Sequence, residues 1–182
     1  AKHPALLDEL LDSRTLYLVP TKERLASELR ATMLRIEPDD LEQQMEALRY
    51  FKAAHNLRIA ACEISGSIPL MKVSDYLSML AEVISNYVMH LCWQEMTTKH
   101  GYPDGDIRQT PNFIVVGYGK LGGIEMSHGS DLDLVFIHNA DSQGQSDGTK
   151  PIENTRFYTR LGQKIIHIMN TRTASDQLYE ID

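Results

Sequence analysis

Two aspartates separated by one residue are the clearest sign of chemistry in this sequence. Asp131 and Asp133 flank Leu132 at the start of the apolar run 132–138, whose composition is typical of a β-strand. Side chains alternate between the two faces of a strand, so we expect both carboxylates on one face, about 7 Å apart along the chain, and His138 on the other. A solvated pair would have the same spacing. Oxygen ligands without His or Cys suit Mg²⁺ or Mn²⁺ rather than zinc.

A glycine-rich turn that contains a lysine precedes these aspartates. It follows the apolar run 113–116 and includes Gly117, Gly119, Lys120, Gly122 and Gly123. Glycine N–H groups and an ammonium group can approach a phosphate closely. A P-loop is excluded because Leu121 stands where that motif needs Ser or Thr, and a dinucleotide-binding fingerprint is disfavoured because residues 129–131 interrupt its helix. The turn is therefore a candidate phosphate-binding element of another kind.

The elements around these motifs indicate a small sheet. Residues 113–116 and 132–138 have strand composition, residues 152–170 helical periodicity, and residues 177–182 the alternation of a last strand. This order predicts an α+β fold, a small mixed sheet with flanking helices and at least one crossover connection. A polar segment rich in Pro and Gly, residues 102–111, separates it from the preceding chain.

The preceding part of the chain has helical periodicity almost throughout. Helices are expected at residues 4–11, 21–35, 41–62 and 74–100. Asp39 or Asp40 can cap the third of these helices, and Gly66 follows its end. We therefore divide the chain into a helical segment, residues 1–109, and a catalytic core, residues 110–182.

Composition limits the classes of function. The chain has 182 residues, and its 18 Lys and Arg against 25 Asp and Glu give a net charge of −7. The basic excess that is typical of nucleic-acid binding is missing, so we expect no nucleic-acid partner. We also expect no membrane association, because no apolar run reaches the roughly 18 residues of a membrane span. Cys62 and Cys92 lack disulfide or zinc spacing and are expected to be buried thiols of a cytoplasmic protein.

The two motifs together resemble a known superfamily. A strand ending in Gly-Lys or Gly-Ser, followed after about ten residues by Ser-Asp-x-Asp, resembles the polymerase-β-type nucleotidyltransferases, with Ser130 opening the metal motif here. The longer string GYGKLGG-x-E-x-x-x-x-SDLDLVF resembles the bacterial glutamine synthetase adenylyltransferase family, in particular its C-terminal, adenylylating module. Further segments that resemble this family lie at residues 2–11, 42–61, 71–75 and 178–182.

This resemblance implies an activity and a role for each motif. The enzyme would transfer AMP from ATP to a tyrosine hydroxyl of glutamine synthetase by two-metal in-line displacement, and would thereby regulate nitrogen assimilation. Asp131, Asp133 and Asp182 would hold Mg²⁺ or Mn²⁺, and Asp182 would also help to remove the tyrosine proton. The phosphates of ATP would be bound by Gly119, Lys120, Gly122, Gly123 and Ser130.

The resemblance also indicates partners and one departure from the family. Glutamine synthetase is the implied protein substrate, and a PII-type signalling protein is a further candidate partner in the bacterial cytoplasm. Family sequences continue beyond Asp182 into an Arg-rich stretch, so the catalytic core is expected to be truncated at its C-terminal end. Alternation places Glu180 and Asp182 on one strand face, and we expect the Asp182 carboxyl group to converge on those of Asp131 and Asp133.

Three alternatives remain open. The chain could be the deadenylylating half of the same enzyme, which uses phosphate to release ADP from the modified tyrosine. It could be a catalytically idle regulatory module whose helices dock a partner, although the retained carboxylates argue against this. A small-molecule nucleotidyltransferase of the antibiotic-modifying type is disfavoured by the long helical segment.

Overall fold

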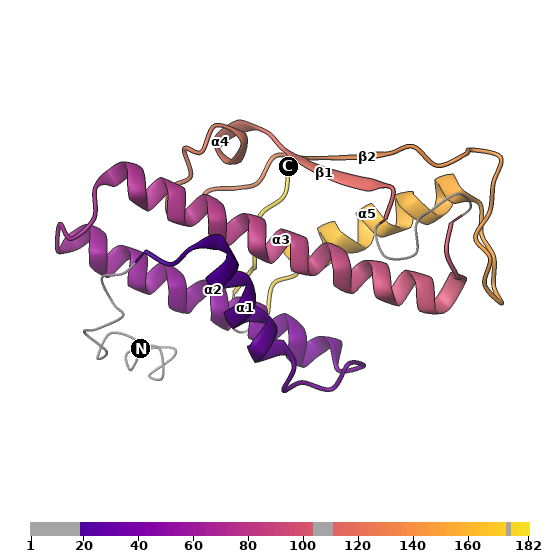
Figure 1. Ribbon diagram of the computed structural model, residues 1–182, viewed down its shortest axis with the longest axis horizontal. Helices are drawn as coiled ribbons and strands as arrows, with labels where there is room; N and C mark the ends of the chain where they lie inside the picture. The colour runs from indigo at the N-terminus through magenta and orange to yellow at the C-terminus, as the bar shows by residue number, and fades with distance from the viewer. Residues whose placement is uncertain (1–18, 104–110, 174–175) are drawn as a thin grey trace.

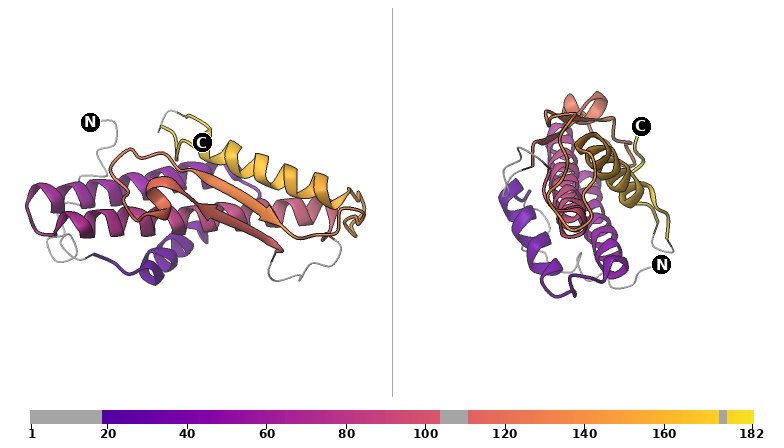
Figure 2. Two further views of the ribbon diagram at one scale, coloured as in Figure 1. Left: turned by 90° about the horizontal axis from the view of Figure 1, so that it is seen from above. Right: turned by 90° about the vertical axis from the view of Figure 1, so that its right-hand side faces the viewer.

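A layer of helices carries a small sheet on one side. The computed structural model describes residues 19–103, 111–173 and 176–182. The elements in chain order are α1 (Lys22–Met33), α2 (Leu41–Ile64), α3 (Leu70–His100), β1 (Phe113–Gly117), α4 (Gly119–Gly122), β2 (Leu134–His138) and α5 (Asn154–Asn170). Long helices α2 and α3 run side by side and α1 crosses them, while the β1–β2 hairpin lies over α3 with α5 beside it (Figures 1 and 2). The predicted α+β class is confirmed.

Capping residues set most helix ends where the sequence indicated. Asp40 accepts a hydrogen bond from Gln43 N at 2.9 Å and begins α2, and Gly66, with φ of +67°, follows its end. Helix α3 ends at His100 as expected, but it begins four residues before the predicted Ser74. Pro69 explains the earlier start, because its fixed φ and missing N–H suit the beginning of a helix. The predicted helix at residues 4–11 lies outside the described residues.

Aromatic side chains join the sheet to the helices. The Trp93 ring of α3 lies 5.6 Å from that of Phe157 on α5, in an edge-to-face arrangement. Tyr158 stacks on Phe113 of β1 at 5.8 Å and on His138 of β2 at 4.6 Å. His138 therefore packs against α5, and the burial pattern confirms its predicted place on the strand face opposite the two aspartates. One hydrophobic cluster contains residues from both sides of residue 110, and the proposed domain division stays a prediction.

The β-hairpin pairs antiparallel, with Phe113 opposite His138 and Gly117 opposite Leu134. The predicted third strand at residues 177–182 is wrong as a strand, because it forms only one parallel bridge, between Leu132 and Ile181. Two of its backbone N–H groups bond to the end of α5 instead of to a ladder, since Tyr179 N donates to Met169 O at 3.1 Å and Ile181 N donates to Asn170 Oδ1 at 2.9 Å. The connection from β2 through α5 to this bridge is the predicted crossover.

Both cysteines are buried and unpaired with each other, as expected, and burial raises the pKa of Cys92 to about 12. Across residues 19–103, 111–173 and 176–182, no helix has the length and apolar character needed to traverse a bilayer.

A buried polar chain connects the first three helices. His55 on α2 is 1% exposed, and its Nδ1 lies 2.7 Å from the hydroxyl of Tyr76 on α3. Its Nε2 lies 3.3 Å from Glu28 Oε1 on α1. This hydrogen bond from His55 holds the pKa of Glu28 below its ordinary value, and burial raises that of Tyr76. Both ring nitrogens of His55 therefore have polar partners, without which burying this side chain would be costly.

The Glu28 interaction predicts an acid-sensitive contribution to stability. Because the folded-state pKa of Glu28 is depressed, its contribution is present above pH 4.5, the ordinary glutamate pKa, and is lost as the pH falls through the folded-state value. We expect Glu28→Gln to flatten the pH dependence of the unfolding free energy below pH 4.5, measured by urea denaturation. Glu37→Gln, at an exposed position, is the control. Parallel curves for Glu28→Gln and the parent would contradict this assignment.

Candidate active site

The turn between β1 and β2 brings a glycine against one of the two aspartates. Tyr118 N donates to Asp133 O at 2.8 Å and holds the turn against the residues before β2. Gly119 has φ of +53°, and a Cβ there would lie 2.0 Å from Asp133 Oδ2. Both the backbone conformation and the close approach therefore require glycine. The Asp133 carboxylate lies directly against the backbone of the turn.

Lys120 and Asp131 form a second contact between the two motifs. Lys120 Nζ lies 3.4 Å from Asp131 Oδ1, and the two side chains are 54% and 39% exposed. An ion pair this long and this exposed is weak and is screened by salt. The lysine can therefore exchange this carboxylate for another anion at small cost.

The two aspartates lie immediately before β2, not within the strand as the sequence predicted. Leu132 between them is fully buried, whereas Asp131 and Asp133 are half-buried. This alternation agrees with the predicted common face for the two carboxylates. Chemically the pair offers hard oxygen ligands at the protein surface, next to a flexible cation.

Asp182 reaches the same region through backbone pairing. Leu132 N donates to Glu180 O at 2.9 Å, and Asp182 N donates to Leu132 O at 3.2 Å. This parallel register sets Asp182 beside Asp133, with the two residues on the same face. Within the described part of the chain, no three His, Cys, Asp or Glu side chains are grouped so that they could hold a metal ion. The structure thus places the residue beside the pair, and the role of its carboxyl group stays a prediction.

The other predicted phosphate ligands are engaged within their own turns. Ser130 is 8% exposed, and its Oγ accepts a hydrogen bond from Ser127 N at 3.0 Å. Gly122 N donates to Tyr118 O at 3.1 Å and Gly123 N to Gly119 O at 3.0 Å. These groups shape the site in this structure, while Gly119 and Lys120 face the aspartates.

A salt bridge that the sequence did not indicate supports the loop before the aspartates. His128 Nε2 lies 2.9 Å from Glu63 Oε2, in the last turn of α2. The side chain of His128 is 38% exposed. The partner could not be predicted, because the two residues are 65 positions apart.

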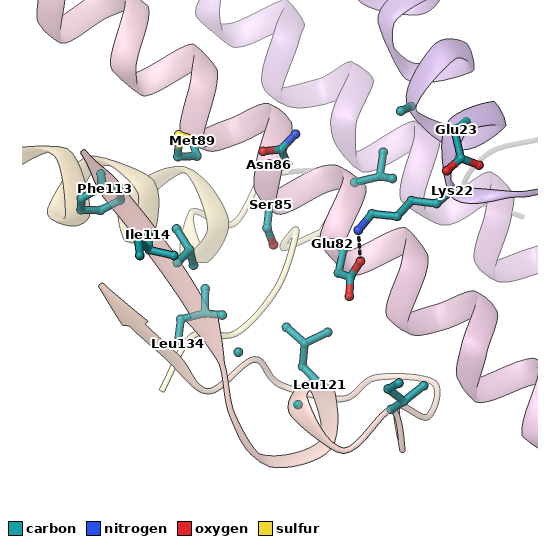
Figure 3. A pocket seen from close by; sticks show the side chains of 16 residues that line it. Lys22, Glu23, Glu82, Ser85, Asn86, Met89, Phe113, Ile114, Leu121 and Leu134 are labelled. Carbon is teal, nitrogen blue, oxygen red and sulfur yellow. Dashed lines mark hydrogen bonds and ion pairs between the residues drawn. The ribbon is translucent and has the colours of Figure 1, made fainter. Parts of the chain in front are cut away.

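A groove of about 800 Å³ lies on the other side of the same turn, between the sheet and the helices α1 and α3 (Figure 3). Gly117, Leu121 and Gly122 line it at the turn, and the Lys22–Glu82 ion pair lies at the helical side. Ser85 Oγ on α3 points into it and has no hydrogen-bond partner among the described residues. The groove adjoins the α4 turn, but neither Asp131 nor Asp133 lines it.

Comparison with known proteins gives a consistent result over the whole chain. The family model described as "Glutamate-ammonia ligase adenylyltransferase" matches residues 1–182. Proteins called "Bifunctional glutamine synthetase adenylyltransferase/adenylyl-removing enzyme" are 57% identical in Pseudomonas putida, 52% in Idiomarina loihiensis and 51% in Pasteurella multocida. Each alignment covers 100% of this chain and 19% of the relative, so the chain spans about a fifth of their length. The chain belongs to the glutamate-ammonia ligase adenylyltransferase family.

Proposed function

We propose that this chain contains the nucleotidyl-transfer site that moves AMP from ATP to a tyrosine hydroxyl of glutamine synthetase. The observation that carries the proposal is the pair of half-buried carboxylates, Asp131 and Asp133, held against Gly119 and Lys120 of the α4 turn. The name of the relatives covers both adenylyl transfer and adenylyl removal. We favour transfer for this chain because its motif resembles the adenylylating module.

The residues present fit a magnesium–nucleotide complex. Mg²⁺ usually joins one or two carboxylates to substrate phosphates, so Asp131 and Asp133 suffice as protein ligands without a cluster of three. Mn²⁺ accepts the same oxygen donors. When bound, the metal would stabilise negative charge on the phosphates. Asp182 is the proposed third ligand, as its register beside Asp133 allows.

The side chains of this chain would then divide the remaining work. Lys120 would leave Asp131 and bind the β and γ phosphates, which the length of its present ion pair favours. The tyrosine oxygen would attack the α-phosphorus, and the bond to the β-phosphate oxygen would break with its electron pair leaving on pyrophosphate. The phenol proton would pass to the Asp182 carboxylate, since a phenol with a pKa near 10 is mostly protonated at neutral pH.

Glutamine synthetase is the proposed protein substrate, and the bacterial cytoplasm is the proposed location. A PII-type signalling protein stays a predicted further partner. If the chain were a catalytically idle module, its carboxylates could be neutralised without loss of function in the complete enzyme. Assays of AMP transfer by the complete polypeptide and its aspartate variants distinguish a transferase from an idle module.

The direct test is incubation of the complete polypeptide that contains this chain with ATP, Mg²⁺ and unmodified glutamine synthetase. We expect intact mass spectrometry to show a gain of one adenylyl group per synthetase subunit, and EDTA to prevent it. A reaction that proceeds only with adenylylated synthetase and phosphate, and that releases ADP, would favour the deadenylylating half.

Neutralising the aspartates should separate activity from folding. We expect Asp131→Asn and Asp133→Asn each to lower the rate of AMP transfer roughly hundredfold or more. Each variant loses one charged ligand of the metal that would bind the ATP phosphates. The melting temperature should stay close to that of the parent, since both side chains are half-buried and removing one charge relieves their mutual repulsion. Asp39→Asn, at an exposed position, is the control. Retained transfer would refute the catalytic assignment, and a large fall in melting temperature would make these residues structural.

Two glycines with the same backbone strain provide a matched pair of variants. Gly119 and Gly129 have φ of +53° and +76°, but only at Gly119 would a Cβ collide with Asp133. We expect Gly129→Ala to lose roughly 1 kcal/mol of unfolding free energy and Gly119→Ala to lose at least as much. Only Gly119→Ala should also lose most of the AMP transfer, measured by mass spectrometry of the synthetase. Equal activity in the two variants would show that the contact with Asp133 is not needed.

A further inference from the structure

Three side chains on one stripe of α2 contact the segment that follows α5. Glu46, Arg49 and Lys52 are spaced three residues apart along the helix. Arg49 is 4% exposed, and its Nη2 donates to Thr171 O at 2.7 Å. Glu46 Oε1 accepts hydrogen bonds from Arg49 Nη1 at 3.2 Å and from Thr173 Oγ1 at 2.6 Å. The start of this C-terminal segment, yellow in Figure 1, is therefore attached to the helical layer.

Lys52 makes the contact nearest to Asp182. Its Nζ donates a hydrogen bond to Leu178 O and lies 4.0 Å from the centroid of the Tyr179 ring. Leu178 and Tyr179 are 1% and 5% exposed. Lys52 is itself half-buried, and this burial lowers the pKa of its ammonium group, while the nearby Asp176 acts in the opposite direction. A half-buried cation is stabilised by compensating partners, and here a carbonyl oxygen and an aromatic face are among them.

The chain between Lys52's contacts and Asp182 is short and held at successive residues. Tyr179 N donates to Met169 O at 3.1 Å, and Ile181 N donates to Asn170 Oδ1 at 2.9 Å. Asp182 N then donates to Leu132 O at 3.2 Å. Only Glu180 and Ile181 lie between Tyr179 and Asp182, so the placement of residues 178–179 restricts where Asp182 can lie.

We propose that Lys52 is a positioning residue for Asp182, through which α2 fixes the third carboxylate of the nucleotidyl-transfer site. This inference rests on the proposed function, in which Asp182 is a ligand and proton acceptor. Lys52 acts through the Leu178 carbonyl and the Tyr179 ring, and it touches neither ATP nor the aspartates. Its removal should impair the step that needs Asp182 more than the binding of ATP, which depends on the α4 turn.

The test compares three variants of the complete polypeptide that contains this chain. Lys52→Met keeps the aliphatic stem but removes the ammonium group, Lys52→Arg restores a donor and a cation, and Lys72→Met removes a surface lysine paired with Asp75. We expect Lys52→Met to lower kcat by about ten- to a hundredfold, as for a small misplacement of a catalytic group. KM for ATP should change by no more than about twofold, because phosphate binding does not involve Lys52. Lys52→Arg should recover most of kcat, and Lys72→Met should match the parent.

A double-mutant cycle separates positioning from general stability. Lys52→Met should weaken Mn²⁺ binding in the presence of ATP, measured by electron paramagnetic resonance, in the parent but not in the Asp182→Asn background. Equal weakening in both backgrounds, an unchanged kcat, or a failure of Lys52→Arg to rescue would each overturn the proposal. If Lys52→Met does not fold, Tyr179→Leu removes the ring while keeping burial, and the same cycle applies to it. Persistent AMP transfer by the Asp131→Asn variant would instead refute the proposed function. That outcome is measured without any change at Lys52, so the two failures can be told apart.

Discussion

The hydrogen bonds on the two sides of Leu132 are the contacts on which the site depends. They join the residues before β2 to the segment after α5, and in this way bring together parts of the chain that are about 50 residues apart. Leu132 is fully buried, so its neighbours Asp131 and Asp133 must turn toward the opposite, partly exposed face. Because the register is parallel, Asp182 is set beside Asp133. The backbone pairing of one buried leucine thus fixes where Asp131, Asp133 and Asp182 lie along the chain relative to one another.

The helices and the first two strands could be predicted because their signals are local. Periodicity, Asp40 and Gly66 indicate the ends of α2, since a cap acts on backbone groups within one turn. The predicted start of α3 at Ser74 is four residues too late. Serine is a common helix-capping residue, whereas Pro69 favours a helix start only through its fixed φ and its missing N–H group. Residues 177–182 alternate like a strand but form a single bridge. The alternation of polar and apolar residues predicts which side chains are buried. It does not show that the backbone N–H groups of Tyr179 and Ile181 bond to the end of α5.

The candidate site was predictable to the same extent. The spacing of Asp131 and Asp133 predicts their common face. The glycine at position 119 is expected from the sequence to approach a phosphate, and the contact with Asp133 that the structure shows there is not indicated by the sequence. The roles within the turns were less visible, because Ser130, Gly122 and Gly123 bond to near neighbours. The groove, the His128–Glu63 pair and the Lys52 contacts join residues far apart in the sequence. No local pattern encodes such pairs, which appear only once the helices and the sheet are packed.

The attachment of the C-terminal segment to α2 also bears on the order in which the molecule assembles. The Arg49–Thr171 and Lys52–Leu178 contacts close loops of 122 and 126 residues, whereas the β-hairpin closes locally. Loop-closure entropy and the need for completed α2 and α5 make such distant contacts late events in folding. During synthesis on the ribosome, α2 emerges long before residue 178 is added. Asp131 and Asp133 are therefore synthesised before the contacts of α2 with residues 171–178 can form, and Asp182 takes its place only when the C-terminal segment closes back on α2.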